Sequence, residues 1–203
     1  MSPAISEKRF PDPVVALDIG NVSMRLTFDG MYRSLDADPA DPDAVARLWE
    51  HGAALETGRC TVPEFLDRLD ELTGHRHTRQ ELLDGWRCGV REPMPGMLAT
   101  VRALVARGVR FSFMSDISPI HLEQVFRYCE FAHLVSGGIY SFEARAFKLD
   151  GYAMFEAFER RYGQPVAFFD DRVEIIRHAR EFGWNVIRFE SPEQVLRDAE
   201  ALL

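Results

Sequence analysis

The sequence predicts an α/β fold, in which a Rossmann-like three-layer core with a parallel sheet carries a small all-helical cap inserted after the first strand. Three observations predict it. Short apolar runs, each ended by a polar residue, alternate with segments of helical periodicity. The connection between the first two runs is far longer than one crossover needs. That connection shows helix starts and helical periodicity but no strand pattern.

The strands are predicted from the apolar runs. The first run, residues 14–17, lies between prolines and a Gly-Asn turn, which is typical of a strand that is buried on both faces. Four further runs are expected to complete the sheet: residues 111–114, 166–169, 185–189 and, with the weakest pattern, 133–135.

Helical segments separate these runs. Residues 95–108, 152–163 and 173–183 carry apolar side chains at helical spacing, and each segment ends at a glycine, which commonly terminates a helix. Ser191, followed by Pro192 and Gln194, has the pattern of a capping box before a last helix. This alternation favours a parallel sheet with helices on both faces.

The cap is predicted from the long connection. Ser115 lies 97 positions after Asp18, whereas a strand–helix–strand crossover takes about 30 residues. Three helix starts are recognised by their capping residues, Asp41, Thr61 and Thr78. We therefore predict a core domain made of residues 1–28 and 95–203, and a helical cap subdomain made of residues 29–94.

Composition limits the functions that the chain could have. It has 203 residues, of which 46% are hydrophobic, as in an ordinary globular protein. Asp and Glu outnumber Lys and Arg by 32 to 24, and this net charge of −8 argues against a nucleic-acid partner. No run approaches the ~20 apolar residues of a membrane helix, and the N-terminus lacks the apolar stretch of a signal peptide. Three scattered cysteines fit a reducing compartment, so we expect a cytoplasmic protein with no membrane or nucleic-acid partner.

Chemically active residues stand where the expected strands end. Asp18 follows the first strand, Ser115 the second, and Asp170 with Asp171 the strand over residues 166–169. The carboxyl ends of parallel strands lie at one edge of a sheet, so these groups should face one crevice. Clustered carboxylates repel one another unless a cation intervenes, and an oxygen-only ligand set favours Mg²⁺. A carboxylate can also attack as a nucleophile.

Each of these residues also has a purely structural interpretation. An aspartate or serine after a strand is most often a helix cap or a turn residue. An acidic pair in that place often serves the first turn of the following helix. The coincidence of such residues at three strand ends favours a functional site.

The same segments resemble the motifs of the haloacid dehalogenase-like superfamily of aspartyl phosphotransferases, in the family's order and over about residues 13–190. The four segments are VVALDIGN around Asp18, FSFMSD around Ser115, AFKLDGYAMFEAF around Lys148, and FFDD at Asp170 and Asp171. The chain is similar to the bacterial glucose-1-phosphatase-like subgroup, whose members carry a helical cap.

This resemblance implies an enzyme: a Mg²⁺-dependent phosphatase that hydrolyses a small phosphorylated metabolite, such as a sugar phosphate, through an aspartyl-phosphate intermediate. It implies that Asp18 is the nucleophile and that Ser115 and Lys148 complete the catalytic set. The implied metal ligands are Asp18, Gly20 through its carbonyl, Asp170 and Asp171. The residues implied beside the substrate phosphate are Asn21, Ser115, Asp116 and Lys148.

Four positions depart from the family pattern. Gly20 stands where most family phosphatases have a general-acid aspartate, a kind of group typically worth about 10²–10⁴-fold in rate. Asp116 replaces an asparagine of the subgroup, Leu149 a proline, and Ile175 a polar residue that supports the metal. Two alternatives therefore stay open: a haloacid dehalogenase, against which the acidic pair argues, and a catalytically weak relative that binds a phosphorylated ligand or a protein partner.

Overall fold

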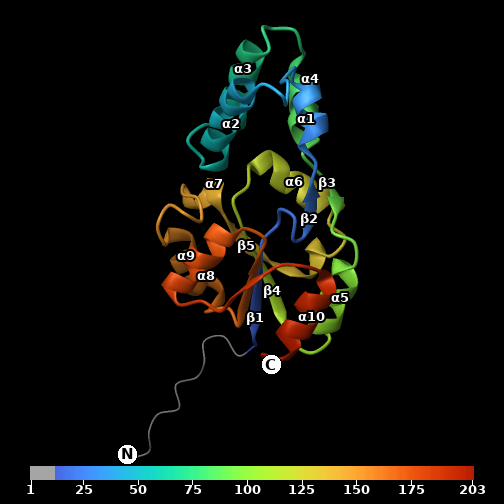
Figure 1. The fold of residues 1–203 in the computed structure, drawn as a ribbon, viewed down its shortest axis with the longest axis vertical. Coiled ribbons are helices and arrows are strands. Elements are labelled where there is room, and N and C mark those ends of the chain that lie inside the picture. Colours follow the sequence, from blue (N-terminus) through green and yellow to red (C-terminus); the bar gives the residue numbers. More distant parts are fainter. Residues whose placement is uncertain (1–11) are drawn as a thin grey trace, which may run out of the picture.

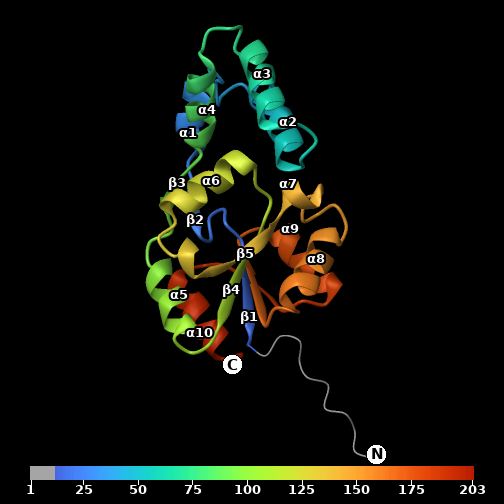
Figure 2. The same ribbon diagram turned by 180° about the vertical axis from the view of Figure 1, so that it is seen from behind.

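A five-stranded parallel sheet forms the centre of the protein. The computed structural model describes residues 12–203, so the part of the predicted core domain at residues 1–11 lies outside the described chain. The strand order is β5-β4-β1-β6-β7, and every neighbouring pair is parallel. Figures 1 and 2 show this core with the helices of the insert above it. The predicted α/β class with a helical insert is confirmed.

The elements of the core alternate along the chain. Its strands are β1 (Val14–Leu17), β4 (Arg110–Ser115), β5 (Val135–Tyr140), β6 (Ala167–Asp170) and β7 (Val186–Arg188). Its helices are α5 (Met97–Val105), α6 (Pro119–Tyr128), α7 (Ser141–Ala144), α8 (Ala153–Tyr162), α9 (Val173–Phe182) and α10 (Pro192–Glu200), with a 3₁₀ turn η1 (Ala132–Leu134) before β5.

The run of strand β1 contains no polar position, and the packing of the strand shows why. Val15 and Leu17 pack in one apolar cluster with side chains of α5 and α10, whereas Val14 and Ala16 pack in a second cluster with α8 and α9. Successive side chains of a strand point to opposite faces, so a strand with a helix layer on each face buries its side chains on both sides and is largely apolar. Figure 1 shows α5 and α10 on one side of the sheet and α8 and α9 on the other.

The predicted strand over residues 133–135 was wrong in position. Residues 132–134 form the 3₁₀ turn, and β5 begins at Val135 and continues to Tyr140. Gly137 has a φ of 102°, and the pairing of β5 with β4 shifts register between Phe111 and Phe113. Glycines in a strand often mark such an irregularity, and they interrupt the apolar run by which a strand is recognised.

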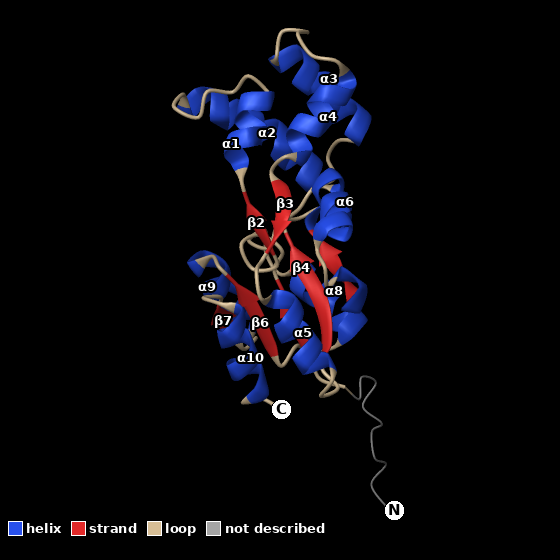
Figure 3. Ribbon diagram, turned by 90° about the vertical axis from the view of Figure 1, so that its right-hand side faces the viewer, coloured by secondary structure: helices blue, strands red, loops and turns tan. Residues whose placement is uncertain are grey.

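The insert contains a strand that the prediction of an all-helical cap excluded. β2 (Met24–Leu26) and β3 (Val90–Pro93) form a two-stranded antiparallel ribbon, and β3 lies inside residues 29–94. In Figure 3 this ribbon lies between the cap helices and the core sheet. β3 has two exposed charged residues, Arg91 and Glu92, and only its pairing with the distant β2 makes it a strand. The proposed boundaries of the two domains stay a prediction.

Four helices make up the rest of the insert: α1 (Phe28–Ser34), α2 (Pro42–Glu56), α3 (Val62–Leu72) and α4 (Arg79–Arg87). The three predicted helix starts are confirmed: Asp41 caps α2, and Thr61 and Thr78 form capping boxes at α3 and α4. The insert also contacts the core, because the buried Trp86 stacks on His121 of α6 at 5.1 Å. Across residues 12–203, no helix has both the length and the apolar character needed to cross a membrane.

Candidate active site

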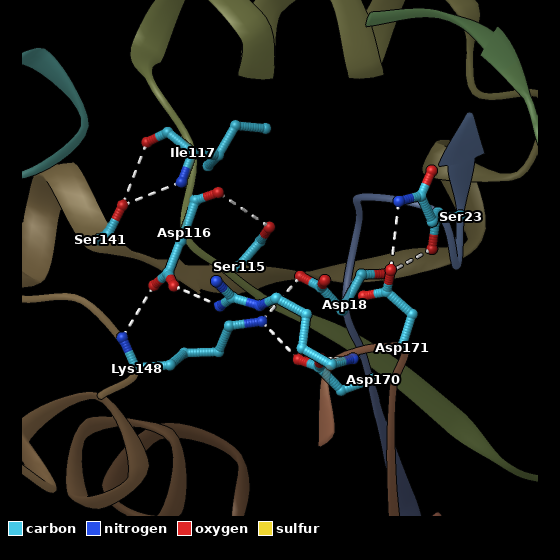
Figure 4. Close-up of polar contacts among 11 residues, drawn as sticks. Asp18, Ser23, Ser115, Asp116, Ile117, Ser141, Lys148, Asp170 and Asp171 are labelled. Carbon is cyan, nitrogen blue, oxygen red and sulfur yellow. Dashed lines mark hydrogen bonds and ion pairs between the residues drawn. The ribbon is translucent and has the colours of Figure 1, made fainter. Parts of the chain in front are cut away.

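The ends of three adjacent strands bring the predicted residues together. β4, β1 and β6 are neighbours in the sheet, and they carry Ser115, Asp18 and Asp170 at or next to their carboxyl ends. One carboxylate oxygen from each of Asp18, Asp170 and Asp171 lies within 4.8 Å of the others. Figure 4 shows these side chains pointing toward one another, with Lys148 reaching between them. The predicted convergence on one crevice is therefore what the structure shows.

Lys148 is the cation at the centre of this group. Its Nζ lies 3.0 Å from Asp18 Oδ1 and 2.5 Å from Asp170 Oδ2, and its side chain is fully buried. Burial lowers the pKa of Lys148, but the carboxylates of Asp170 and Asp18 more than offset this, so the pKa lies above the ordinary value of a lysine. Lys148 is one of only two lysines in the chain; the other basic side chains, apart from histidines, are arginines. A compact ammonium fits between two carboxylates where a planar guanidinium would need more room.

Asp18 lies in an environment that suits a nucleophile. Burial raises its pKa to about 6, although Lys148 and the Ser115 hydroxyl favour its charged form. Within the described chain, Asp18 Oδ1 is buried and makes no hydrogen bond, and its charge partner is Lys148. At neutral pH the carboxylate is therefore mostly ionised, with a weakly solvated oxygen at the strand end.

The turn after β1 fixes the orientation of these groups. The Ser23 hydroxyl donates to the Asp18 carbonyl at 2.8 Å, and two backbone N–H groups, those of Ser23 and Met24, donate to the carbonyl of Ile19. Asn21 has a φ of 52°, a left-handed conformation that asparagine tolerates. Its Nδ2 donates to Asp171 Oδ2 at 3.1 Å, so the amide orients a carboxylate, and its contact with a substrate phosphate stays a prediction.

A second ion pair compensates the unusual Asp116. Its Oδ2 accepts a hydrogen bond from Arg172 Nη2 at 2.7 Å, and its Oδ1 accepts one from the Lys148 backbone N–H at 2.8 Å. The extra negative charge that the sequence places beside the site is thus balanced by Arg172. Sequence reasoning missed this arginine, because its partner lies 56 positions earlier and only the fold brings the two together.

A side chain at Gly20 would be crowded by Leu26 in this conformation. A Cβ added at Gly20 would lie 3.0 Å from Leu26 Cδ1, so the leucine side chain would have to shift by a few tenths of an ångström. The side chain of Leu26, on β2, therefore packs against the position where an aspartate of the family pattern would begin. An apolar side chain therefore lies beside the position where the family pattern has a carboxylate.

A cavity of about 500 Å³ opens beside these residues, within the range of small-molecule sites. Cap and core both line it. The charged and polar lining includes Asp18, Gly20, Asn21, Glu56, Ser115, Asp116, Lys148, Asp150, Asp171 and Arg172. The apolar lining is formed by Leu26, Phe28, Trp49, Phe147 and Leu149. Glu56 and Trp49 were not among the predicted site residues, since neither lies in a motif.

Ile175, which departs from the family pattern, does not line this cavity. It is buried in the apolar cluster that contains side chains of α8 and α9.

The donor set fits a hard divalent cation. Asp18, Asp170 and Asp171 offer only carboxylate oxygens, which Mg²⁺ prefers over nitrogen or sulfur. Both oxygens of Asp170 already accept hydrogen bonds, from the Arg172 N–H at 2.9 Å and from Lys148 Nζ. Each carboxylate oxygen has a second lone pair, so these bonds leave capacity for a metal.

Comparison with known proteins adds the fold family. No protein-family model matches the sequence, and no curated protein matches it. An enzyme of the haloacid dehalogenase (HAD) family from Bacteroides thetaiotaomicron, in complex with magnesium and inorganic phosphate, superimposes with a TM-score of 0.75 at 16% identity, covering 89% of this chain and 95% of the other.

Two further structures agree. A HAD-like hydrolase from Porphyromonas gingivalis gives a TM-score of 0.75 at 18% identity, covering 94% of this chain and 97% of that one. The L-2-haloacid dehalogenase of Xanthobacter autotrophicus gives 0.62 at 14% identity, covering 94% and 83%. Structural similarity at such low sequence identity shows a shared fold only. Here the shared fold extends over nearly the whole chain. The protein therefore has the fold of the haloacid dehalogenase-like hydrolases.

Proposed function

We propose that this protein is a Mg²⁺-dependent phosphatase that hydrolyses a small phosphorylated metabolite through an aspartyl-phosphate on Asp18. The observation that carries the proposal is the acidic cluster of Asp18, Asp170 and Asp171 around the buried Lys148, at the strand ends of a HAD-like fold. The magnesium and phosphate in the Bacteroides enzyme support it. The cluster also favours this chemistry over haloacid dehalogenation, in which the aspartate attacks carbon and clustered acids that recruit a metal serve no purpose.

Each residue of the site has its own role in this proposed reaction. The Asp18 carboxylate attacks phosphorus, while Ser115 and Lys148 hold the transferring phosphoryl oxygens. Lys148 also weakens the repulsion between the substrate and Asp18, and fixed charge of this kind is usually the largest catalytic contribution. Asp18, Asp170, Asp171 and the Gly20 carbonyl would hold Mg²⁺, which supplies positive charge to the phosphoryl group when bound.

The first test is metal dependence. Wild-type protein should release phosphate from a panel of phosphorylated metabolites with Mg²⁺ and stop when EDTA is added. Asp171→Asn should lose Mg²⁺ affinity, measured by calorimetry, because one of the three carboxylate charges that attract the cation is removed. Asp150→Asn is the matched control, since Asp150 lines the same cavity outside the acidic cluster and its loss should leave Mg²⁺ binding intact. Undiminished Mg²⁺ affinity in Asp171→Asn would contradict the proposed metal site.

The apolar lining predicts what the rest of the substrate resembles. The rings of Phe28 and Trp49 lie 5.0 Å apart on the cap side, and Trp49 Nε1 is held by the Tyr32 hydroxyl at 2.9 Å. Such a wall would contact a planar or apolar face of the substrate. Trp49→Ala should raise KM for para-nitrobenzyl phosphate by about fivefold, since aromatic contacts are worth about 1 kcal/mol. Inhibition by inorganic phosphate should hardly change, and an equal loss for both ligands would indicate a general collapse of the cap.

The cysteines bear on the compartment. Cys60, Cys88 and Cys129 are all free thiols in this structure. Unpaired thiols are typical of proteins in a reducing environment. This supports our proposal that the protein works in the cytoplasm.

A further inference from the structure

The proposed reaction lacks a proton donor on the core side of the cavity. The leaving-group oxygen needs a proton when the P–O bond breaks, and Gly20 supplies none. The other acids are engaged: Asp18 attacks, Asp116 pairs with Arg172, and Asp150 accepts the Phe147 N–H at 3.0 Å. Asp170 and Asp171 belong to the acidic cluster. A donor that belongs to the protein therefore has to come from the cap.

Glu56 is a cap carboxylate that lines this cavity. It is the last residue of α2, and it lines both the main cavity and a smaller adjoining one of about 60 Å³. Both cavities are also lined by Gly20, Leu26, Ser115 and Asp116, so Glu56 opens on the side of the site where the general acid is missing. Among residues 12–203, no hydrogen bond or ion pair is formed with its carboxylate, which leaves it free to bind a ligand.

The end of α2 is fixed against the core, so Glu56 has a defined place. The Ser141 hydroxyl donates to the Glu56 carbonyl at 2.5 Å and accepts the Ile117 N–H at 2.9 Å. Ile117 follows Ser115 and Asp116 directly, and Figure 4 shows Ser141 beside this loop. Gly58, with a φ of 62°, packs so closely that an added Cβ would lie within 2.3 Å of the Phe142 carbonyl oxygen. Ser141 is therefore a positioning residue for Glu56.

We propose that Glu56 is the general acid and base of the phosphatase reaction, in place of the aspartate that Gly20 replaces; this inference rests on the proposed function. When Asp18 attacks, the P–O bond to the leaving group breaks, and the leaving oxygen takes the bond's electron pair and the Glu56 proton. The resulting Glu56 carboxylate then removes a proton from water. The water oxygen attacks phosphorus, the bond to Asp18 breaks, and inorganic phosphate and protonated Glu56 result.

The electrostatic surroundings support this role. Burial raises the pKa of Glu56 to about 7, Asp116 adds to the rise, and Arg172 opposes it. A carboxyl at a helix C-terminus is also disfavoured in its charged form. The other ionisable groups that line the two cavities are Asp18, His121, Lys148, Asp150 and Asp171. Burial lowers the pKa of His121 to about 4, so it is neutral near pH 7. An acid that titrates near the working pH can both give and take a proton.

Two matched substrates separate the steps. para-Nitrophenyl phosphate has a leaving group that departs as a stable anion, whereas para-nitrobenzyl phosphate carries the same ring on an alkoxide that needs a proton. Glu56→Gln should lose about 10²–10⁴-fold in turnover of the benzyl ester. With the nitrophenyl ester it should show a burst of about one nitrophenolate per enzyme, followed by slow turnover, because the water of the second step lacks its base. Glu50→Gln, an exposed change on the same helix, should behave as wild type.

The outcomes are distinguishable. If wild type is active and Asp18→Asn is not, but Glu56→Gln matches wild type on both esters, the inference falls and the proposed function stands. If neither wild type nor variant releases phosphate from any ester, the proposed function falls first. Glu56→Ala provides the second measurement: added formate should restore benzyl ester turnover in a concentration-dependent way. An equal loss on both esters with no burst and no rescue would assign Glu56 a merely structural role.

Discussion

Asp18→Asn is expected to abolish phosphate release from every ester tested, by about 10⁴-fold or more, since removing the nucleophile of a covalent hydrolase can cost about 10⁶-fold. The reason is that the asparagine amide cannot form the bond to phosphorus that the carboxylate forms. The measurement is phosphate release under saturating substrate, together with mass spectrometry of acid-quenched protein. Wild type should carry one phosphoryl group on Asp18, and the variant none.

The loss should not come from unfolding. Burial holds the pKa of Asp18 at about 6, above its ordinary value of 3.8, so the folded state binds a proton more tightly than the unfolded chain. Asp18 therefore lowers the free energy of unfolding as pH rises from about 4 through about 6. Asp18→Asn removes this contribution. The free energy of unfolding of the variant should therefore fall less than that of the wild type between about pH 4 and about pH 6. An active Asp18→Asn protein would contradict the assignment of the nucleophile and leave a binding role as the better explanation.

Lys148→Met is expected to have the largest effect on stability. The change leaves the buried carboxylates of Asp18 and Asp170 facing each other without a cation, and breaking a buried ion pair from one side costs about 3–5 kcal/mol. Phosphate release should be lost as well, because the phosphoryl oxygens lose their positive partner. Urea unfolding monitored by circular dichroism measures the first effect.

The pH dependence of this variant identifies the cause. Without Lys148 the pKa of Asp18 should rise further above 6, because Lys148 favours the charged form in the wild type. The destabilisation should then be larger at about pH 8 than at about pH 5, where the carboxyl takes up a proton. Arg160→Met is the matched control: its partner Glu156 and Arg160 itself are both exposed, and such pairs contribute about 1 kcal/mol or less. If Lys148→Met lowers the free energy of unfolding no more than Arg160→Met does, the buried carboxylates of Asp18 and Asp170 do not need the lysine for stability.

Several features of the protein could be predicted from sequence because they depend on neighbours along the chain. The apolar run before Asp18 predicts a strand covered on both faces, and Thr61 and Thr78 predict helix starts by their own capping chemistry. The meeting of Asp18, Ser115 and Asp170 follows from parallel strands sharing one carboxyl edge, which holds for any strand order that keeps them adjacent.

Other features were decided by contacts between distant segments. β3 is a strand only because β2 pairs with it, and the glycines of β5 conceal a strand that β4 completes. Arg172 balances Asp116 across 56 positions, and Leu26 fills the space beside Gly20. Nothing local distinguishes Glu56 from the exposed Glu50 on the same helix. The burial of a side chain, and with it the pKa, depends on which segments pack against it. The sequence by itself therefore determined where the acidic cluster would form, because the strand ends carry its residues. Only the tertiary structure decided which cap carboxylate faces the cluster.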